Sequence, residues 1–200
     1  LHTVFSRSDE NGDAYEIEEP DEALRRWGAL WNEGSFPEIP VRRYLEEQHD
    51  RFWLFDPERP FFQVPGIKGT DYTAAKLNGA LSESNNKTRL FPPCAGEGKA
   101  ALSYAEAARW LLFVNGYDDT SAKPKQKGLP SPGAGWLGKI GAVYAVGENL
   151  FETLMFNLVF LRDRYSCWKE SKPVWEREKP KAGERTEIPL PDNQPELLTL

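Results

Sequence analysis

Two long stretches of turn-forming residues limit what this chain of 200 residues can fold into. The first, Ser82–Gly98, contains Asn85-Asn86, Pro92-Pro93 and two glycines, and the second, Lys123–Gly138, is rich in Lys, Pro and Gly. Because such residues end helices and strands, both stretches are expected to be exposed loops. The chain therefore reads as an α+β protein whose two long loops are the first place to look for a functional surface.

Three segments have the periodicity of amphipathic helices. Pro20–Glu33 places apolar residues three and four apart, with acids in its first turn and Gly34 at its end. A second helix is expected from about Pro40 to Asp50. A third follows Ser103, which stands three residues before Glu106 as in a capping box, and is expected to end at Gly116.

The remaining segments predict shorter elements. Residues 51–64 contain two prolines, Pro57 and Pro60, and are expected to form short extended pieces with turns. Ile140–Val146 reads as a strand, residues 149–162 as an apolar, buried helix, and Ser171–Asp192 as irregular. Aromatic residues in apolar runs are expected in the core: Phe52, Phe55, Phe61, Phe113, Phe151 and Phe156.

Composition places the chain among soluble globular proteins, with 40% hydrophobic and 28% charged residues. The apolar run Asn149–Leu161 is too short to cross a membrane. No signal peptide is recognisable at the N-terminus, and Cys94 and Cys167 do not suggest a disulfide framework, so a cytoplasmic location is expected.

Charge is distributed unevenly. The net charge of −6 argues against a protein that coats nucleic acid nonspecifically, and acids crowd the stretch Asp9–Glu22. In contrast, no acid occurs in Thr120–Gly147 or in Ser84–Gly96. Local charge in the two loops is therefore more informative than the average.

Motifs for nucleotide binding and catalysis are weak. Gly133–Lys139 has the spacing GxxxxGK, but Ile140 stands where a phosphate-binding loop needs Ser or Thr, and a Gly-rich turn is the preferred interpretation. His49 is expected to decorate a helix end, and the carboxylates of Glu46 and Glu47 to lie on a polar helix face. We predict no enzyme, no cofactor and no bound metal.

The two loops carry the residues of interest, each with an alternative. Phe91 lies in a polar loop, and either anchors that loop on the domain or contacts nucleic acid. Lys123, Lys125 and Lys127 form either a solvated loop or a contact with phosphates.

An ordered series of segments resembles the N-terminal domain of CasA proteins, also called the Cse-one family, large subunits of the type I-E CRISPR surveillance complex Cascade. The series spans roughly residues 20 to 200. It comprises Asp50–Gln63, Ala75–Leu77, Glu83–Phe91, Leu102–Leu112, Tyr117-Asp118, Gly147–Leu154, Asn157-Leu158 and Pro173–Arg177.

The resemblance implies a fold and a role. The fold is a mixed α/β N-terminal domain, present here over residues 1–200 as a piece truncated at both ends, without the C-terminal four-helix bundle of the family. The implied role is a non-catalytic subunit that recognises the protospacer-adjacent motif in duplex DNA, mainly from the minor groove, and helps open the duplex for guide pairing. The implied partners are the other Cascade subunits, the 5′ handle of the guide RNA, double-stranded target DNA and the recruited helicase–nuclease.

Two family loops align with the two loops of this chain. The first, which docks the subunit near the guide handle, matches Asn85, Asn86, Lys87, Thr88, Arg89 and Phe91. The second, a glycine loop that approaches the minor groove, is placed by order between Asp119 and Gly135 and would include Thr120, Ser121, Lys123, Lys125 and Lys127. Residues 119–122 hold no glycine here, which departs from the family pattern, and Cys94 alone cannot reproduce the four-cysteine zinc cluster of some members.

Two rival functions remain open at the level of sequence. One is a nucleotide-dependent enzyme built on Gly133–Lys139. The other is a protein–protein scaffold without direct nucleic-acid contact, for which the acidic stretch Asp9–Glu22 is the motivating feature.

Overall fold

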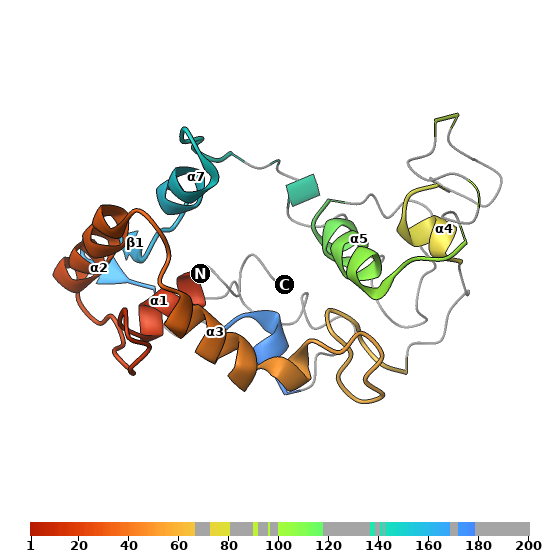
Figure 1. Cartoon of the computed structure of the whole chain (residues 1–200), viewed down its shortest axis with the longest axis horizontal. Helices are drawn as coiled ribbons and strands as arrows, with labels where there is room; N and C mark the ends of the chain where they lie inside the picture. The colour runs from red at the N-terminus through yellow and green to blue at the C-terminus, as the bar shows by residue number, and fades with distance from the viewer. Residues whose placement is uncertain are drawn as a thin grey trace. The chain divides into compact units, whose positions relative to one another are not determined.

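The computed structural model describes residues 1–66, 73–80, 90–91, 96, 100–117, 137–138, 141, 143–168 and 172–178, in two compact units. The described part of unit 1 is residues 1–53, 143–168 and 172–178. The described part of unit 2 lies between residues 54 and 141. The elements are short helices and a small two-stranded sheet (Figure 1), which confirms the predicted α+β class.

Unit 1 contains most of the elements. They are α1 (His2–Arg7), α2 (Pro20–Glu33), α3 (Glu38–Glu47), the 3-10 turn η1 (His49–Arg51), α7 (Leu150–Phe156), β1 (Leu161–Asp163), β2 (Ser166–Cys167) and a second 3-10 turn, η3 (Val174–Glu176). The strands pair antiparallel, with Leu161 opposite Cys167 and Asp163 opposite Ser166. The short helix α1 was not predicted from the sequence.

The boundaries of α2 confirm the prediction at both ends. Glu19 is the N-cap, and the side chain of Glu22 accepts hydrogen bonds from the backbone N–H of Glu18 and of Glu19, at 3.1 Å and 3.2 Å. Pro20 occupies the first turn, where its missing N–H costs nothing. Gly34 ends the helix with φ of 72°, a left-handed conformation that favours glycine.

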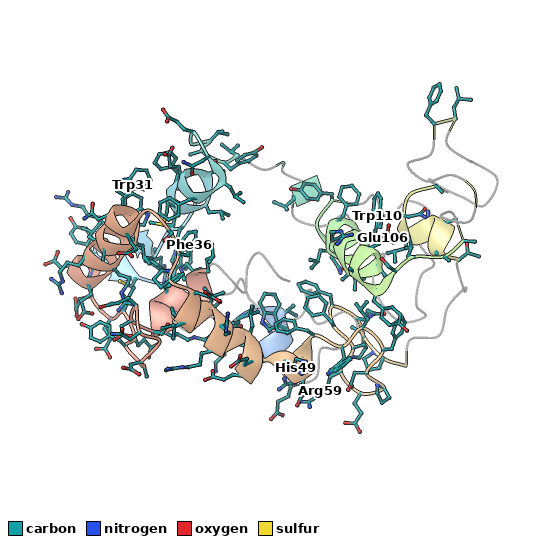
Figure 2. All side chains as sticks on the ribbon, in the orientation of Figure 1. Trp31, Phe36, His49, Arg59, Glu106 and Trp110 are labelled. Carbon is teal, nitrogen blue, oxygen red and sulfur yellow. The ribbon has the colours of Figure 1, made fainter. Side chains whose placement is uncertain are left out.

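The core of unit 1 joins residues from both ends of the chain. Phe5 and Met155 have no exposed surface, and they are buried together with Val4, Ile17, Ala23, Leu30, Leu158, Phe160 and Cys167. Trp31 and Phe36, labelled in Figure 2, both contact the ring of Phe151 on α7, with ring centroids 6.2 Å and 5.1 Å away. Contacts between α2 and the region around α7 therefore hold the unit together.

A polar cluster fixes η3 on the helices of unit 1. The carboxylate of Glu176 accepts hydrogen bonds from Arg7 Nη1, at 3.0 Å and 3.1 Å, and from the Tyr44 hydroxyl at 2.7 Å. Trp175 Nε1 donates to the same hydroxyl at 2.8 Å. Burial, followed by the hydrogen bond to Glu176, raises the pKa of Tyr44. The cluster ties α1, α3 and η3 together across most of the sequence.

Two helices of unit 2 are described over their whole length. These are α4 (Ala74–Leu77) and α5 (Tyr104–Tyr117). Ser103 begins α5 as predicted: its side chain and backbone N–H both bond to Glu106 Oε2, at 2.7 Å and 2.9 Å. The helix passes through Gly116, so the predicted end is one residue early.

Several predictions for the second half of the chain are wrong. Residues 143–146 and Gly141 form no strand, because both backbone groups of Ala145 bond to the side chain of Asn157 instead of to another chain segment. The helix predicted over residues 149–162 stops at Phe156. Asn157 ends it by donating from Nδ2 to the carbonyl of Thr153 at 2.6 Å, and Leu161 already belongs to β1.

Other boundaries and burial predictions also need correction. The second helix runs over Glu38–Glu47 and is followed by η1, rather than running from Pro40 to Asp50. Residues 52–64 form turns without a strand, and η3 interrupts the tail expected to be irregular. Phe55, Phe113 and Phe156 are exposed rather than buried, whereas Phe151 packs against the core.

Candidate nucleic-acid interface

The first loop of interest shows two exposed apolar side chains. Leu90 and Phe91 have exposed fractions of 85% and 87%. Phe91 therefore does not pack as an anchor on the described part of unit 2. The other predicted residues of this loop lie outside the described residues: Asn85, Asn86, Lys87, Thr88 and Arg89.

Helix α5 presents an aromatic row that sequence reasoning missed. Trp110, Phe113 and Tyr117 lie three and four residues apart, with ring centroids separated by 5.7 Å and then 5.5 Å. Phe113 and Tyr117 are nearly half exposed. Figure 2 labels Trp110 and the capping Glu106 on this helix. The spacing of the aromatics immediately before the Lys-rich segment was the signal that could have revealed the row.

The residues on either side of the stretch 118–136 lie close together in unit 2. Gly138 lies so close to Tyr117 that a Cβ on the glycine would come within 2.5 Å of the Tyr117 carbonyl oxygen. A Cβ on Gly116 would be 3.4 Å from the side chain of Leu137. Residues 118–136 therefore connect two points that touch at the C-terminal end of α5.

The predicted contacts within this segment lie outside the described residues. They are Thr120, Ser121, Lys123, Lys125 and Lys127. Leu137 and Gly138, from the GxxxxGK motif, are helical, and Gly138 makes the close approach to Tyr117 that only a residue without a Cβ allows. Gly138 therefore has a packing role at the end of α5.

The acidic stretch Asp9–Glu22 is unsuited to contact with nucleic acid. In unit 1, most of the acids of Asp9–Glu22 are exposed, and Glu22 is held by the capping box described above. Hydrogen bonds from the backbone N–H groups of Asp13 and Asn11 lower the pKa of Asp9. The exposed carboxylates of this stretch would repel a phosphate backbone.

A family model described as CRISPR-associated protein Cse1 matches residues 1–200. The chain belongs to this family. A curated relative, the CRISPR-associated protein CasA/Cse1 of Thermus thermophilus, is 33% identical over 165 residues, which cover 80% of this chain and 32% of the relative.

Two solved structures of CasA from Thermus thermophilus support the same placement. They superpose with TM-scores of 0.60 and 0.55, at 28% and 26% sequence identity, and each match covers 90% of this chain. The chain spans about a third of the length of these CasA proteins, 34% and 36% respectively. The predicted family is thereby confirmed.

Other candidate chemistry in the CasA-like chain is sparse where the structure describes it. His49 and Asp50 are exposed neighbours 3.5 Å apart, at the end of α3 as predicted, and Glu46 and Glu47 are exposed. Burial raises the pKa of the Cys167 thiol, and Cys94 lies outside the described residues. In the described ranges, no three His, Cys, Asp or Glu side chains gather as metal ligands, and no helix is long and apolar enough to span a bilayer.

Proposed function

We propose that the chain is part of a non-catalytic, cytoplasmic subunit of the type I-E CRISPR surveillance complex Cascade. In this proposal the subunit reads the protospacer-adjacent motif in duplex DNA, helps to open the duplex and recruits the helicase–nuclease. The observation that carries the proposal is the family match along all 200 residues. Guide pairing would read the target sequence, and the protein only the short motif.

The two loops of unit 2 have separate roles in the proposal. The exposed Leu90–Phe91 pair suits docking beside the guide RNA handle and a neighbouring subunit, because an apolar side chain that stays in water gives up about 1.5–3 kcal/mol of burial free energy. The acid-free window Thr120–Gly147, which carries Lys123, Lys125 and Lys127, suits an approach to DNA. Its lysines would contact phosphates and position the loop.

The test of DNA contact replaces Lys123, Lys125 and Lys127 together by Glu in the full-length protein within the assembled complex. Affinity for duplex DNA carrying the adjacent motif should fall about tenfold or more, because three phosphate contacts would be lost and reversed. The slope of log affinity against log salt should also become shallower. Gel-shift titrations at several salt concentrations measure both.

A matched control has the same change in charge away from the interface. Arg25, Arg164 and Lys172 are exposed residues of unit 1, and their joint replacement by Glu should leave the salt slope unchanged. An equal loss of affinity in both triple variants would attribute the effect to overall charge and count against the proposed contact.

A second candidate is a protein–protein scaffold without direct nucleic-acid contact. The exposed acids of Asp9–Glu22 favour it, since they suit a basic protein surface. Unchanged DNA affinity and an unchanged salt slope in the Lys variant would favour the scaffold. Failure of the full-length protein to co-purify with the guide RNA and the other subunits would contradict the Cascade assignment itself.

A further inference from the structure

The segment that enters α7 exposes apolar side chains on an ordered backbone. Val143, Tyr144 and Val146 have exposed fractions of 103%, 63% and 72%. No residue from Gly141 to Gly147 is charged. Figure 1 shows this teal segment as an irregular trace that leads into α7.

Side chains of α7 and its C-cap hold one edge of the segment. Ala145 N–H donates to Asn157 Oδ1 at 3.0 Å, and Asn157 Nδ2 donates to the Ala145 carbonyl at 2.8 Å. Gly147 N–H donates to Thr153 Oγ1 at 3.0 Å. The amide of Asn157 thus makes with Ala145 the two reciprocal bonds that a residue of an antiparallel strand would make.

The opposite edge has no partner within the described residues. Among the described residues, no hydrogen bond involves the backbone of Tyr144 or Val146. The N–H and the carbonyl of Ala145, which lies between them, are both hydrogen-bonded. None of these three residues has a positive φ. The absence of positive φ is compatible with an extended chain, in which the backbone groups of successive residues point to opposite edges. In that conformation those of Tyr144 and Val146 would face away from Asn157 and be open to a second strand.

The residues of this open edge favour an extended strand as the binding partner. Valine and tyrosine favour strands, and the segment was predicted from its sequence as one. A helix has no backbone groups left to offer such an edge, and the segment has no cation to attract nucleic acid. An exposed, uncharged strand edge promotes aggregation, and covering the edge with another segment is one way in which folded proteins avoid this.

We propose that Val143–Val146 is an edge strand completed by an extended, apolar segment of the same polypeptide, from the part of the full-length protein outside these 200 residues. Relatives about three times as long supply ample chain for this pairing. The incoming strand exchanges hydrogen bonds with Tyr144 and Val146 and covers their side chains. This inference is independent of the DNA-binding role.

Hydrogen exchange of single backbone amides in the isolated full-length protein tests the pairing. The amides of Tyr144 and Val146 should exchange at least about 100-fold more slowly than in an unstructured chain, as amides in a paired strand do. Exchange of both at unstructured rates, with Ala145 still protected by Asn157, would overturn the proposal. Protection that arises only after assembly with other subunits would also overturn it, because the strand would then come from another protein.

Two variants at one position separate the strand bond from the side chain. Val146→Pro removes the N–H while leaving Ala145 in the extended region that a following proline favours. Val146→Ala keeps the N–H. The Pro variant should accelerate exchange at Tyr144 about tenfold or more, and the Ala variant by less than about threefold. Equal effects of the two variants would contradict a backbone pairing.

Discussion

The two units differ in where their apolar side chains lie. In unit 1, Phe5 on α1 and Met155 on α7 meet in a core with no exposed surface on either residue. In the described part of unit 2, only Asn78 and Ala80 are buried, and Phe55 and Phe91 are 74% and 87% exposed. Unit 1 is therefore stabilised by contacts of its own, whereas unit 2 presents apolar surface that other molecules or other parts of the protein can cover.

The polar contacts follow the same division. In unit 1, Glu176 joins Arg7 and Tyr44, which stand 169 and 132 residues away in the sequence. In the described part of unit 2, the side-chain hydrogen bonds are mainly local, such as that between Ser103 and Glu106. Sites for partners are commonly found on segments with few long-range contacts, because such segments can adapt when they bind.

The largest expected effect compares one phenylalanine from each unit. Phe5→Ala should lower the free energy of unfolding by about 3–5 kcal/mol, because a buried ring that stacks on Phe36 is lost and leaves a cavity. Phe55→Ala should change it by less than about 1 kcal/mol, because most of that ring is already in water. Urea unfolding followed by tryptophan fluorescence measures both. Similar losses would show that the two units do not differ in the way described.

A smaller loss is expected from the Glu176 cluster. Glu176→Ala should cost about 2–3 kcal/mol, below the full value for a buried ion pair, since the Arg7 side chain is 33% exposed. Glu176→Gln should cost less, because its amide oxygen can still accept from Tyr44. Glu178, exposed and two residues away, provides the control: Glu178→Ala should change the free energy of unfolding by less than about 0.5 kcal/mol. Equal urea midpoints for Glu176→Ala and the wild type would remove the proposed role of the cluster.

The helix boundaries that were predicted correctly are those set by residues close to them in the sequence. The end at Gly34 and the capping box at Ser103 depend on residues within one turn, so the sequence was sufficient for α2 and for the start of α5. The helix α1 is six residues long and lacks a side-chain cap, and its burial depends on residues near 155–160. Nothing within its own sequence could reveal it.

The errors after residue 140 have one physical origin. Val143, Tyr144 and Val146 have strand propensity, but a strand also needs a partner, and Asn157 satisfies only one edge. The same asparagine stops α7 at Phe156, where the apolar pattern continues. At the candidate interface, the exposure of Phe91 could not be read from its polar neighbours, which suited an anchor equally well, and the aromatic row of α5 looked like core.

The smallest expected effect on stability belongs to Phe91. Phe91→Ala should change the free energy of unfolding by less than about 0.5 kcal/mol, because 87% of the residue is in water. If Phe91 docks the subunit, the same change should weaken association with the other Cascade subunits and guide RNA about tenfold or more, as expected for an aromatic anchor.

Tyr165→Ala is the matched control for this comparison. Tyr165 is 80% exposed in the turn between β1 and β2 of unit 1, so its loss should affect neither stability nor association. Association measured with purified full-length protein and the remaining complex separates the two positions. A Phe91 variant that associates as the wild type does would show that exposure of this ring has no docking role, and the contrast between the units would then be one of stability alone.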